Sequence, residues 1–347
     1  MRPMAWSTPC YSRTRVDRAG REYVDSASSP DERELARVVI NNWRSSHSYP
    51  LNTLQVNLRG VAAKFDSHAT VAQRIKRLPS IRHKLERFPG MKLSRVQDVG
   101  GCRAVVASVH DVSSIVEYYM SSSQMKHRLV RHDNYIQVPQ HSGYRGEHLI
   151  YAYNSDKRSE WNDLKIELQI RSRLQHAWAT AVETVGTFTQ QALKSSFGEE
   201  DWLNFFALMS SALALREHTP LVPDTPSDPH DLAADLREHV ERLDVVNKLN
   251  AYGQTLRYVE DSISKVKGHT FLLELDSASE TLSIDSYRDR VLAAEEYSAI
   301  ERAIENDPSK DVVLVTVESL DSLRRAYPNY FLDTRVFVDT VIEAIDY

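Results

Sequence analysis

The chain begins with a run of residues without a clear hydrophobic period, followed by two segments with helical spacing. Residues 1–30 are polar and irregular, which predicts an N-terminal arm. Asp31 is a candidate cap for a helix through Val39, and the run 51–64 places Leu54 and Leu58 at helical spacing. A basic helix is expected to begin near residue 70. The first quarter of the chain therefore predicts helices.

Strand-like and helical patterns alternate in the next part of the chain. Strands are expected in 102–109, 132–138, 147–153 and 165–171, and helices in 112–123 and 174–185. This order predicts an α+β fold with a mixed β-sheet flanked by helices. Four prolines between residues 217 and 231 indicate a loop or linker, and a helix is expected from about 232 to 267.

The last eighty residues have the pattern of a small α/β unit. We expect a hairpin from 269–276 and 281–287, a helix in 288–307, a strand in 311–319 and a closing helix in 336–347. The predicted division is therefore an arm (1–30), a catalytic domain (31–198), a helical linker region with the Pro-rich loop (199–267) and a separable C-terminal domain (268–347).

Charge is distributed unevenly along the chain. The formal net charge is -5, but residues 70–176 hold 18 basic and 10 acidic side chains, whereas residues 268–347 hold 7 basic and 17 acidic ones. This asymmetry suggests that the basic segment meets polyanions and that the acidic segment competes for the same face.

Composition excludes several classes of protein. No apolar run is long enough for a membrane span, and the N-terminus lacks the apolar core of a secretory signal. Cys10 and Cys102 are too few for a disulfide framework or a cysteine zinc site, which predicts a cytoplasmic protein without zinc. With 11 glycines there is no Gly-rich phosphate loop, so side chains must hold any nucleotide.

Four groups of residues suggest phosphate chemistry. A basic run contains Arg74, Lys76, Lys84 and Arg87, whose cationic heads suit a triphosphate, although such a run is also typical of a solvated helix. Asp98, in an ordinary-looking turn before a strand, suits a Mg²⁺ ligand, and Arg103 follows it.

The third and fourth groups suggest an acceptor site. Glu167 and Gln169 share one face of a strand, where a carboxylate can share the metal with Asp98 or accept a proton, although a lone Glu is also common at a strand edge. Tyr144 and Arg145 lie in a Gly-flanked loop before His148, and an exposed Tyr beside an Arg suits stacking on a base. Loop tyrosines also serve as packing residues.

Together, and in this order, the groups resemble the RelA/SpoT synthetase domain over roughly residues 50–190. The matching residues are Arg74-x-Lys76, Ser80-Ile81, Lys84, Asp98, Arg103, Gly143-Tyr144, His148, Glu167-x-Gln169-x-Arg171 and His176-Ala177-Trp178-Ala179. This resemblance implies a pyrophosphokinase that moves the β,γ-diphosphate of ATP to a ribose 3′-hydroxyl.

The resemblance assigns a role to each matching residue. It implies that Mg²⁺ is organised by Asp98 and Glu167, which are also the catalytic pair. It implies that ATP is held by Arg74, Lys76, Lys84 and Arg103. It implies that the acceptor is bound by Tyr144, Arg145, His148, Gln169 and Arg171.

Departures from the synthetase pattern bear on the acceptor. Synthetases that use GDP or GTP usually have Pro-Lys before the Gly-Tyr pair, whereas this chain has Pro139-Gln140. The C-terminal Tyr327-Pro-Asn-Tyr330 and the acidic tail resemble the CapRel proteins, fused toxin-antitoxin enzymes of phage defence. That resemblance implies pyrophosphorylation of the tRNA 3′-CCA end, which blocks translation. It also implies a C-terminal pseudo-zinc-finger domain whose Tyr327 and Tyr330 occupy the adenine site until a phage capsid protein binds.

Other interpretations remain open at this point. Tyr327 and Tyr330 are also typical of aromatic residues that anchor a helix end in a small core. The chain could instead be a small alarmone synthetase that makes (p)ppGpp or (p)ppApp from a free nucleotide. A third interpretation, a catalytically inactive nucleotide sensor, is disfavoured by the presence of both Asp98 and Glu167.

Overall fold

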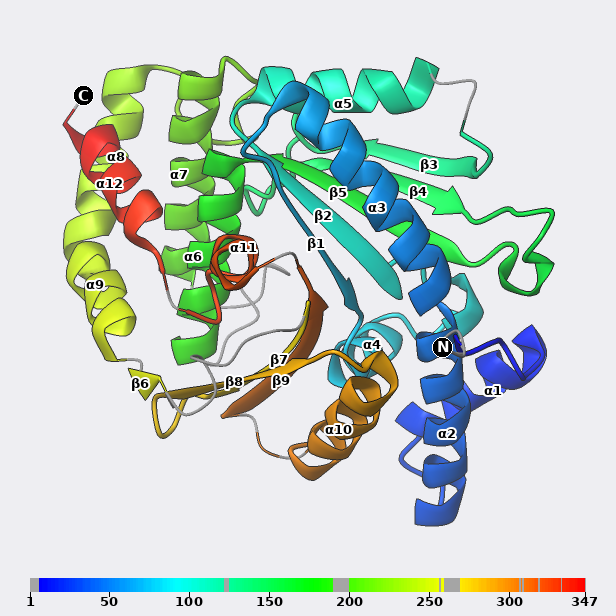
Figure 1. Ribbon diagram of the computed structural model, residues 1–347. Helices are drawn as coiled ribbons and strands as arrows, with labels where there is room; N and C mark the ends of the chain where they lie inside the picture. The colour runs from blue at the N-terminus through cyan, green and yellow to red at the C-terminus, as the bar shows by residue number, and fades with distance from the viewer. Residues whose placement is uncertain are drawn as a thin grey trace.

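The computed structural model describes residues 6–121, 125–189, 200–255, 257–258, 269–305, 307, 309–317, 319–331 and 333–346. In these ranges, the strands form one sheet and the helices lie around it (Figure 1). The α-helices are α1 (Arg13–Val24), α2 (Pro30–Ser46), α3 (Ser48–Phe65), α4 (Leu78–Arg87), α5 (Val109–Ser121), α6 (Arg173–Thr189), α7 (Glu200–Glu217), α8 (Pro229–Leu243), α9 (Val245–Thr255), α10 (Arg290–Ala303), α11 (Leu320–Ala326) and α12 (Arg335–Ile345). Short 3-10 helices are η1 (Leu93–Arg95) and η2 (Ser159–Trp161).

The sheet has the strand order β3-β4-β5-β2-β1-β9-β7-β8-β6. Its strands are β1 (Thr70–Ile75), β2 (Gly100–Val106), β3 (Arg128–Asn134), β4 (Glu147–Ala152), β5 (Lys165–Ser172), β6 (Arg257–Tyr258), β7 (Thr270–Asp276), β8 (Thr281–Tyr287) and β9 (Lys310–Thr316). The β2–β5 and β6–β8 pairs are parallel and the others are antiparallel, which confirms the predicted mixed sheet.

Several N-terminal expectations are wrong. Residues 13–24, expected in an irregular arm, form α1, because Ser12 caps the helix and Val16 and Tyr23 pack against α2 and α4. The cap of α2 is Ser29, in a capping box with Glu32, rather than Asp31. The segment 70–75, expected to be helical, is strand β1, because it pairs along its length with β2.

The middle of the chain also differs from the sequence prediction. The helix expected over 232–267 is broken into α8 and α9 at Asp244, which adopts a left-handed φ of 53°. Residues 256 and 259–268 lie outside the described part of the chain. None of the described helices is long and apolar enough to cross a membrane.

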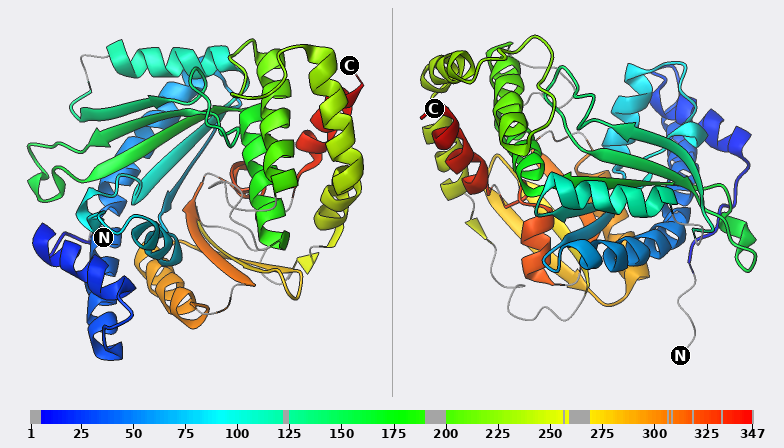
Figure 2. Two further views of the ribbon diagram at one scale, coloured as in Figure 1. Left: turned by 180° about the vertical axis from the view of Figure 1, so that it is seen from behind. Right: turned by 90° about the horizontal axis from the view of Figure 1, so that it is seen from above.

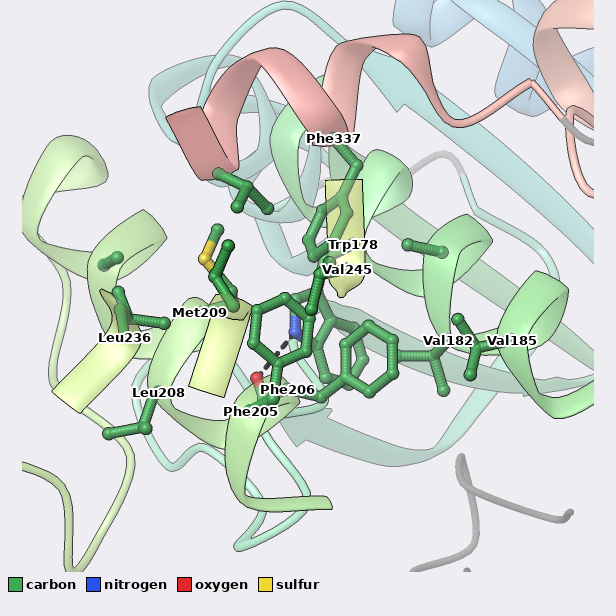
Figure 3. Packing of buried hydrophobic residues seen from close by; sticks show 14 of the residues in the cluster. Trp178, Val182, Val185, Phe205, Phe206, Leu208, Met209, Leu236, Val245 and Phe337 are labelled. Atoms are coloured by element: carbon green, nitrogen blue, oxygen red, sulfur yellow. Dashed lines mark hydrogen bonds between the residues drawn. The ribbon is translucent and has the colours of Figure 1, made fainter. Parts of the chain in front are cut away.

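Different helices cover the two halves of the sheet. Helices α3 and α5 pack on one face of β1, β2, β4 and β5, and Figure 2 (left) shows the molecule from the other side. Helices α6–α9 form a bundle with α12, in which Trp178 donates to the carbonyl of Phe206 at 2.8 Å (Figure 3).

The C-terminal elements contact the rest of the fold through the sheet, through the helical bundle and through α10. The β7–β8 hairpin, α10, β9 and α12 form as predicted, while α11 was not expected. Strand β9 joins β1 through only two residue pairs, and α12 packs into the bundle. In the described structure, residues 269–346 are thus integrated into the fold and do not stand apart from it.

Candidate functional site

Strand register brings the predicted catalytic residues together. Arg74 on β1 pairs with Gly101 on β2, which pairs in turn with Glu167 on β5. In the next row, Ala72 pairs with Arg103 and Arg103 with Gln169. Directly paired residues project from the same face of a sheet. One pocket is lined by Ala72, Arg74, Asp98, Gly101, Cys102, Arg103, Glu167, Gln169 and Tyr327.

Asp98 lies between two lysines. Lys76 Nζ and Lys84 Nζ each donate to a different oxygen of the Asp98 carboxylate, both at 2.8 Å. Burial opposes ionisation of Asp98, but the two ammonium groups hold its pKa well below the usual range. Asp98 is therefore ionised at neutral pH. Both lysines predicted to hold ATP phosphates bind this carboxylate in the described structure, and their contact with ATP stays a prediction.

Glu167 is held by a chain of hydrogen bonds. His148 Nδ1 lies 2.9 Å from Glu167 Oε1, and His148 Nε2 lies 2.6 Å from the Tyr144 hydroxyl. Burial lowers the pKa of His148, but the interactions with Tyr144 and Glu167 outweigh it and raise the pKa to about 9. Gln169 Nε2 donates to the other Glu167 oxygen at 2.6 Å. Burial opposes ionisation of Glu167 as well, yet the pKa of Glu167 is lowered, chiefly by His148.

The acceptor residues are less exposed than expected. Tyr144 is 9% exposed and packs in the helical bundle, and the Arg171 guanidinium lies 4.9 Å from its ring. Arg171 is 1% exposed, and its Nε and Nη1 have no hydrogen-bond partner among the described residues. A buried cation with two unused donors suits an anionic ligand.

Arg145 is buried as well. It is 3% exposed, and it donates to Ser210 Oγ at 2.8 Å and to the Pro220 carbonyl at 2.7 Å. Its guanidinium therefore links the Gly-flanked loop to α7 and the segment after it. The expected contact of Arg145 with the acceptor stays a prediction that this burial disfavours, because these hydrogen bonds already use donors of its guanidinium.

The C-terminal tyrosines lie beside the predicted ATP residues. Arg103 lies 6.0 Å from the centroid of the Tyr327 ring, and its Nη1 donates to the Ala326 carbonyl at 3.4 Å. Tyr330 receives a 3.3 Å hydrogen bond from Arg77 and donates to Asp311 at 2.8 Å. Both tyrosines also belong to the apolar cluster formed by β7, β8, β9 and α11.

Some residues near the site carried no clear sequence signal. Arg44 on α2 forms a buried two-point ion pair with Glu301 on α10, at 2.7 and 3.0 Å, and donates to the Lys76 carbonyl at 2.9 Å. Glu301 also accepts from the Leu78 backbone N–H, at the start of α4, at 2.6 Å. Arg44 and Glu301 are 257 positions apart in the sequence, and a contact at this separation produces no periodic pattern that would predict it.

The two carboxylates are compatible with Mg²⁺. Asp98 and Glu167 line the same pocket, and both are held as anions. Mg²⁺ in phosphate-transfer sites takes one or two carboxylates and completes its shell with substrate oxygens and water. No group of three or more His, Cys, Asp or Glu side chains that could hold a metal occurs among the described residues. A site of this kind therefore depends on the nucleotide for its remaining ligands.

The chain is similar to pyrophosphokinases over part of its length. Residues 73–190 match the family described as "Region found in RelA / SpoT proteins", so the likeness covers about a third of the chain. GTP pyrophosphokinase YjbM of Bacillus subtilis (strain 168) is 30% identical over 135 residues, which cover 37% of this chain and 63% of that protein. GTP pyrophosphokinase YwaC of the same organism is 23% identical over 159 residues, covering 42% and 74%.

Two solved structures match part of the chain at low similarity. Small alarmone synthetase 1 of Bacillus subtilis bound to its product pppGpp matches with a TM-score of 0.44 and 22% identity, covering 53% of this chain and 93% of that one. Small alarmone synthetase 2 of the same organism matches with a TM-score of 0.43 and 19% identity, covering 51% and 93%.

Proposed function

We propose that the chain is a RelA/SpoT-type pyrophosphokinase that transfers diphosphate from ATP to the 3′-hydroxyl of the tRNA CCA end and so blocks translation. The observation that supports transferase activity is one pocket in which cations surround two ionised carboxylates, Asp98 and Glu167. Phosphoryl transfer needs positioning and charge neutralisation more than covalent chemistry, which suits this group. The RelA/SpoT-type region contains both carboxylates.

The proposed reaction assigns a role to each group in the pocket. The ribose hydroxyl oxygen bonds to the β-phosphorus of ATP, the bond from that phosphorus to the α,β-bridging oxygen breaks, and AMP leaves. Glu167 accepts the hydroxyl proton, while Arg74, Lys76 and Lys84 bind the phosphates. The Asp98 and Glu167 carboxylates would hold Mg²⁺, which would neutralise part of the phosphate charge. His148 and Gln169 orient Glu167 through their hydrogen bonds to it.

We further propose that the C-terminal segment, as a pseudo-zinc-finger domain, inhibits its own enzyme. Tyr327 lines the pocket with Arg74 and Asp98, and both lysines that would bind ATP are paired with Asp98. A tethered group has a high effective concentration, on the order of millimolar, so a weak contact is sufficient to exclude ATP. In this proposal a phage capsid protein binds the acidic segment 268–347 and releases it.

Replacing the two tyrosines tests this inhibition. We expect Tyr327→Ala with Tyr330→Ala to raise transfer without any phage protein and to make the chain toxic in cells. Hydrogen exchange of β2 and β5 would verify that the catalytic sheet is still folded. A folded, catalytically competent double variant with no gain in activity would contradict the inhibition by these residues.

The acceptor is tested by following label from ATP. The double variant is incubated with ATP labelled in the β-phosphate and with deacylated tRNA, GDP, GTP or AMP. Label at the tRNA 3′ end supports the proposal. Label on a free nucleotide alone favours the alternative, a small alarmone synthetase, which the names of the two Bacillus relatives favour. Label on none of these, with ATP bound, would favour a nucleotide sensor.

A further inference from the structure

A group of basic side chains surrounds the start of β5, next to the catalytic row. Lys165, Glu167 and Gln169 alternate along β5 and therefore share one face of the strand. Lys165 lies two residues before Glu167, roughly 7 Å along the strand at 3.3–3.4 Å per residue. The register then carries this row across the sheet, since Lys165 pairs with Ala152 and Ala152 with Arg128.

Two further cations, Arg13 and Arg95, belong to elements near the start of β5. Arg13, at the start of α1, donates to the Asp163 carbonyl at 3.5 Å, and Arg128 lies 3.7 Å from the Asp163 carboxylate. Arg95 belongs to η1, which the Asp17 carboxylate holds against α1 through the Ser94 N–H at 2.8 Å. The basic rim is defined here as Arg13, Arg95, Arg128 and Lys165.

The positive charge of the basic rim is poorly compensated. In the described part of the chain, Arg95 and Lys165 take part in no ion pair, and the pair of Arg128 with Asp163 is between side chains that are 68% and 63% exposed. An exposed pair of this kind contributes little. Arg13 and Arg128 both contact Asp163, which precedes Lys165 by two residues, so these cations lie close together.

We propose that the basic rim binds the phosphate backbone of an RNA acceptor and guides its 3′ end to Glu167. The proposal rests on the proposed transfer to tRNA, and it replaces Arg145, which is buried, as the phosphate contact. Three of the four cations, Arg13, Arg95 and Arg128, are exposed, and within the described chain only Arg128 has a carboxylate partner. Such a surface suits a polyanion, whose phosphates are spaced along a chain. A few phosphates contacted at once also fix the register of the strand.

The test compares a long acceptor with a short one. Arg95→Gln with Arg128→Gln removes two charges, and Arg242→Gln on α8, 44% exposed, is the matched control. All are made in the Tyr327→Ala, Tyr330→Ala protein. For whole tRNA we expect kcat/KM to fall at least about tenfold and the slope of log(kcat/KM) against log[salt] to flatten by about 1–2, since each phosphate contact contributes about 0.7–0.9. For the trinucleotide CCA, which is too short to reach the basic rim, kcat/KM should not change.

Other results would overturn the inference. Equal losses with tRNA and with CCA would indicate a structural role, and no loss with either would show that RNA does not contact the basic rim. If no RNA accepts label, tRNA binding measured by fluorescence anisotropy still tests the basic rim. A variant that binds tRNA as tightly as the control would show that the basic rim does not bind RNA, whatever reaction the enzyme catalyses. Loss of binding to phosphatidylserine vesicles with unchanged tRNA binding would assign the surface to lipid and reject RNA.

Discussion

At the scale of single residues, the proposed reaction depends on the charge state of Asp98. Its carboxylate is the proposed metal ligand and is also the partner of Lys76 and Lys84. We expect Asp98→Asn, in the Tyr327→Ala, Tyr330→Ala protein, to lower kcat at least about a hundredfold, as loss of one group that stabilises transition-state charge does. The matched control is Asp201→Asn, an exposed carboxylate on α7. Retained transfer in a folded Asp98→Asn protein would remove Asp98 from the metal site.

The His148–Glu167 pair predicts a dependence of stability on pH. The pKa of His148 is raised to about 9, above its unfolded value of about 6.5. The stabilisation is therefore fully present below about pH 6.5 and is lost as pH rises through about 9, and it is worth up to about 3 kcal/mol at 1.36 kcal/mol per pKa unit. We expect urea unfolding at pH 6, 7.5 and 9 to show this decline, and His148→Gln to remove most of it. An unchanged pH profile in His148→Gln would contradict the pair.

The relative orientation of some site residues was predictable from sequence, because they lie close together in one strand. Glu167 and Gln169 lie two positions apart in a strand, so their common face follows from the pleat. The burial of Tyr144 and Arg145 was not predictable, because the partners of Arg145 lie 65 and 75 residues further along the chain. Loop composition cannot distinguish an exposed side chain from one that is covered by a distant helix.

At the scale of elements, α10 provides a buried, charged attachment of the C-terminal segment in addition to the sheet. Strands β1 and β9 share two residue pairs, whereas Glu301 on α10 binds Arg44 on α2 and the N–H of Leu78 on α4. Both charged side chains are 4% exposed. Because α4 also carries Lys84, the same carboxylate connects the C-terminal segment to the predicted ATP site.

Breaking this ion pair should open the protein. Glu301→Gln leaves the Arg44 charge buried without its partner, which should destabilise the attached arrangement by about 3–5 kcal/mol. The matched control is Arg302→Gln, which removes the exposed Arg302–Glu34 pair between the same two helices and should cost about 1 kcal/mol or less. We expect faster hydrogen exchange in α10 and β9, and a rise in transfer, only in Glu301→Gln. Identical behaviour of the two variants would show that the buried pair does not hold the segment.

Element identity was predicted better than element boundaries. Strands β7, β8 and β9 were predicted because their apolar residues cluster in short runs, but the basic run starting at residue 70 suggested a helix. There, pairing of β1 with β2 on one side and β9 on the other overrides the local composition. The turn at Asp244 likewise had no glycine or proline to indicate it.

At the scale of the whole molecule, the acidic segment 268–347 forms ion pairs with residues that the charge distribution along the sequence did not identify. Ion pairs join it to the rest of the chain at Arg37–Glu305, Arg44–Glu301, Arg77–Asp311, Arg216–Glu343 and Arg302–Glu34. Of these, only Arg77 belongs to the basic run 70–176. Three of these five ion pairs lie on α2. Among the described residues, none of the four cations of the basic rim forms an ion pair with the acidic segment, which agrees with the proposed basic rim.

The chain end connects the C-terminal segment to the helical bundle and so to the stability of the whole protein. Phe337 on α12 is 1% exposed, and its ring centroid lies 6.2 Å from that of Phe205 and 5.9 Å from that of Phe206 (Figure 3). We expect Phe337→Ala to lower the free energy of unfolding by about 3–5 kcal/mol, because it leaves a cavity between α7 and α12. Val336→Ala, at the adjacent position and 56% exposed, should change it by about 0.5 kcal/mol or less.

The elements that lose stability in Phe337→Ala show whether the C-terminal segment is integrated into the fold or is a separable domain. If the described packing of α12 couples the segment to the bundle, Phe337→Ala should accelerate hydrogen exchange in β7 and β9 as well as in α6 and α7, because both sides lose the same anchor. Tryptophan fluorescence from Trp178 and Trp202 would report the bundle in the same samples. Faster exchange in the bundle with unchanged protection of β7 and β9 would show that the C-terminal strands are stabilised independently of α12.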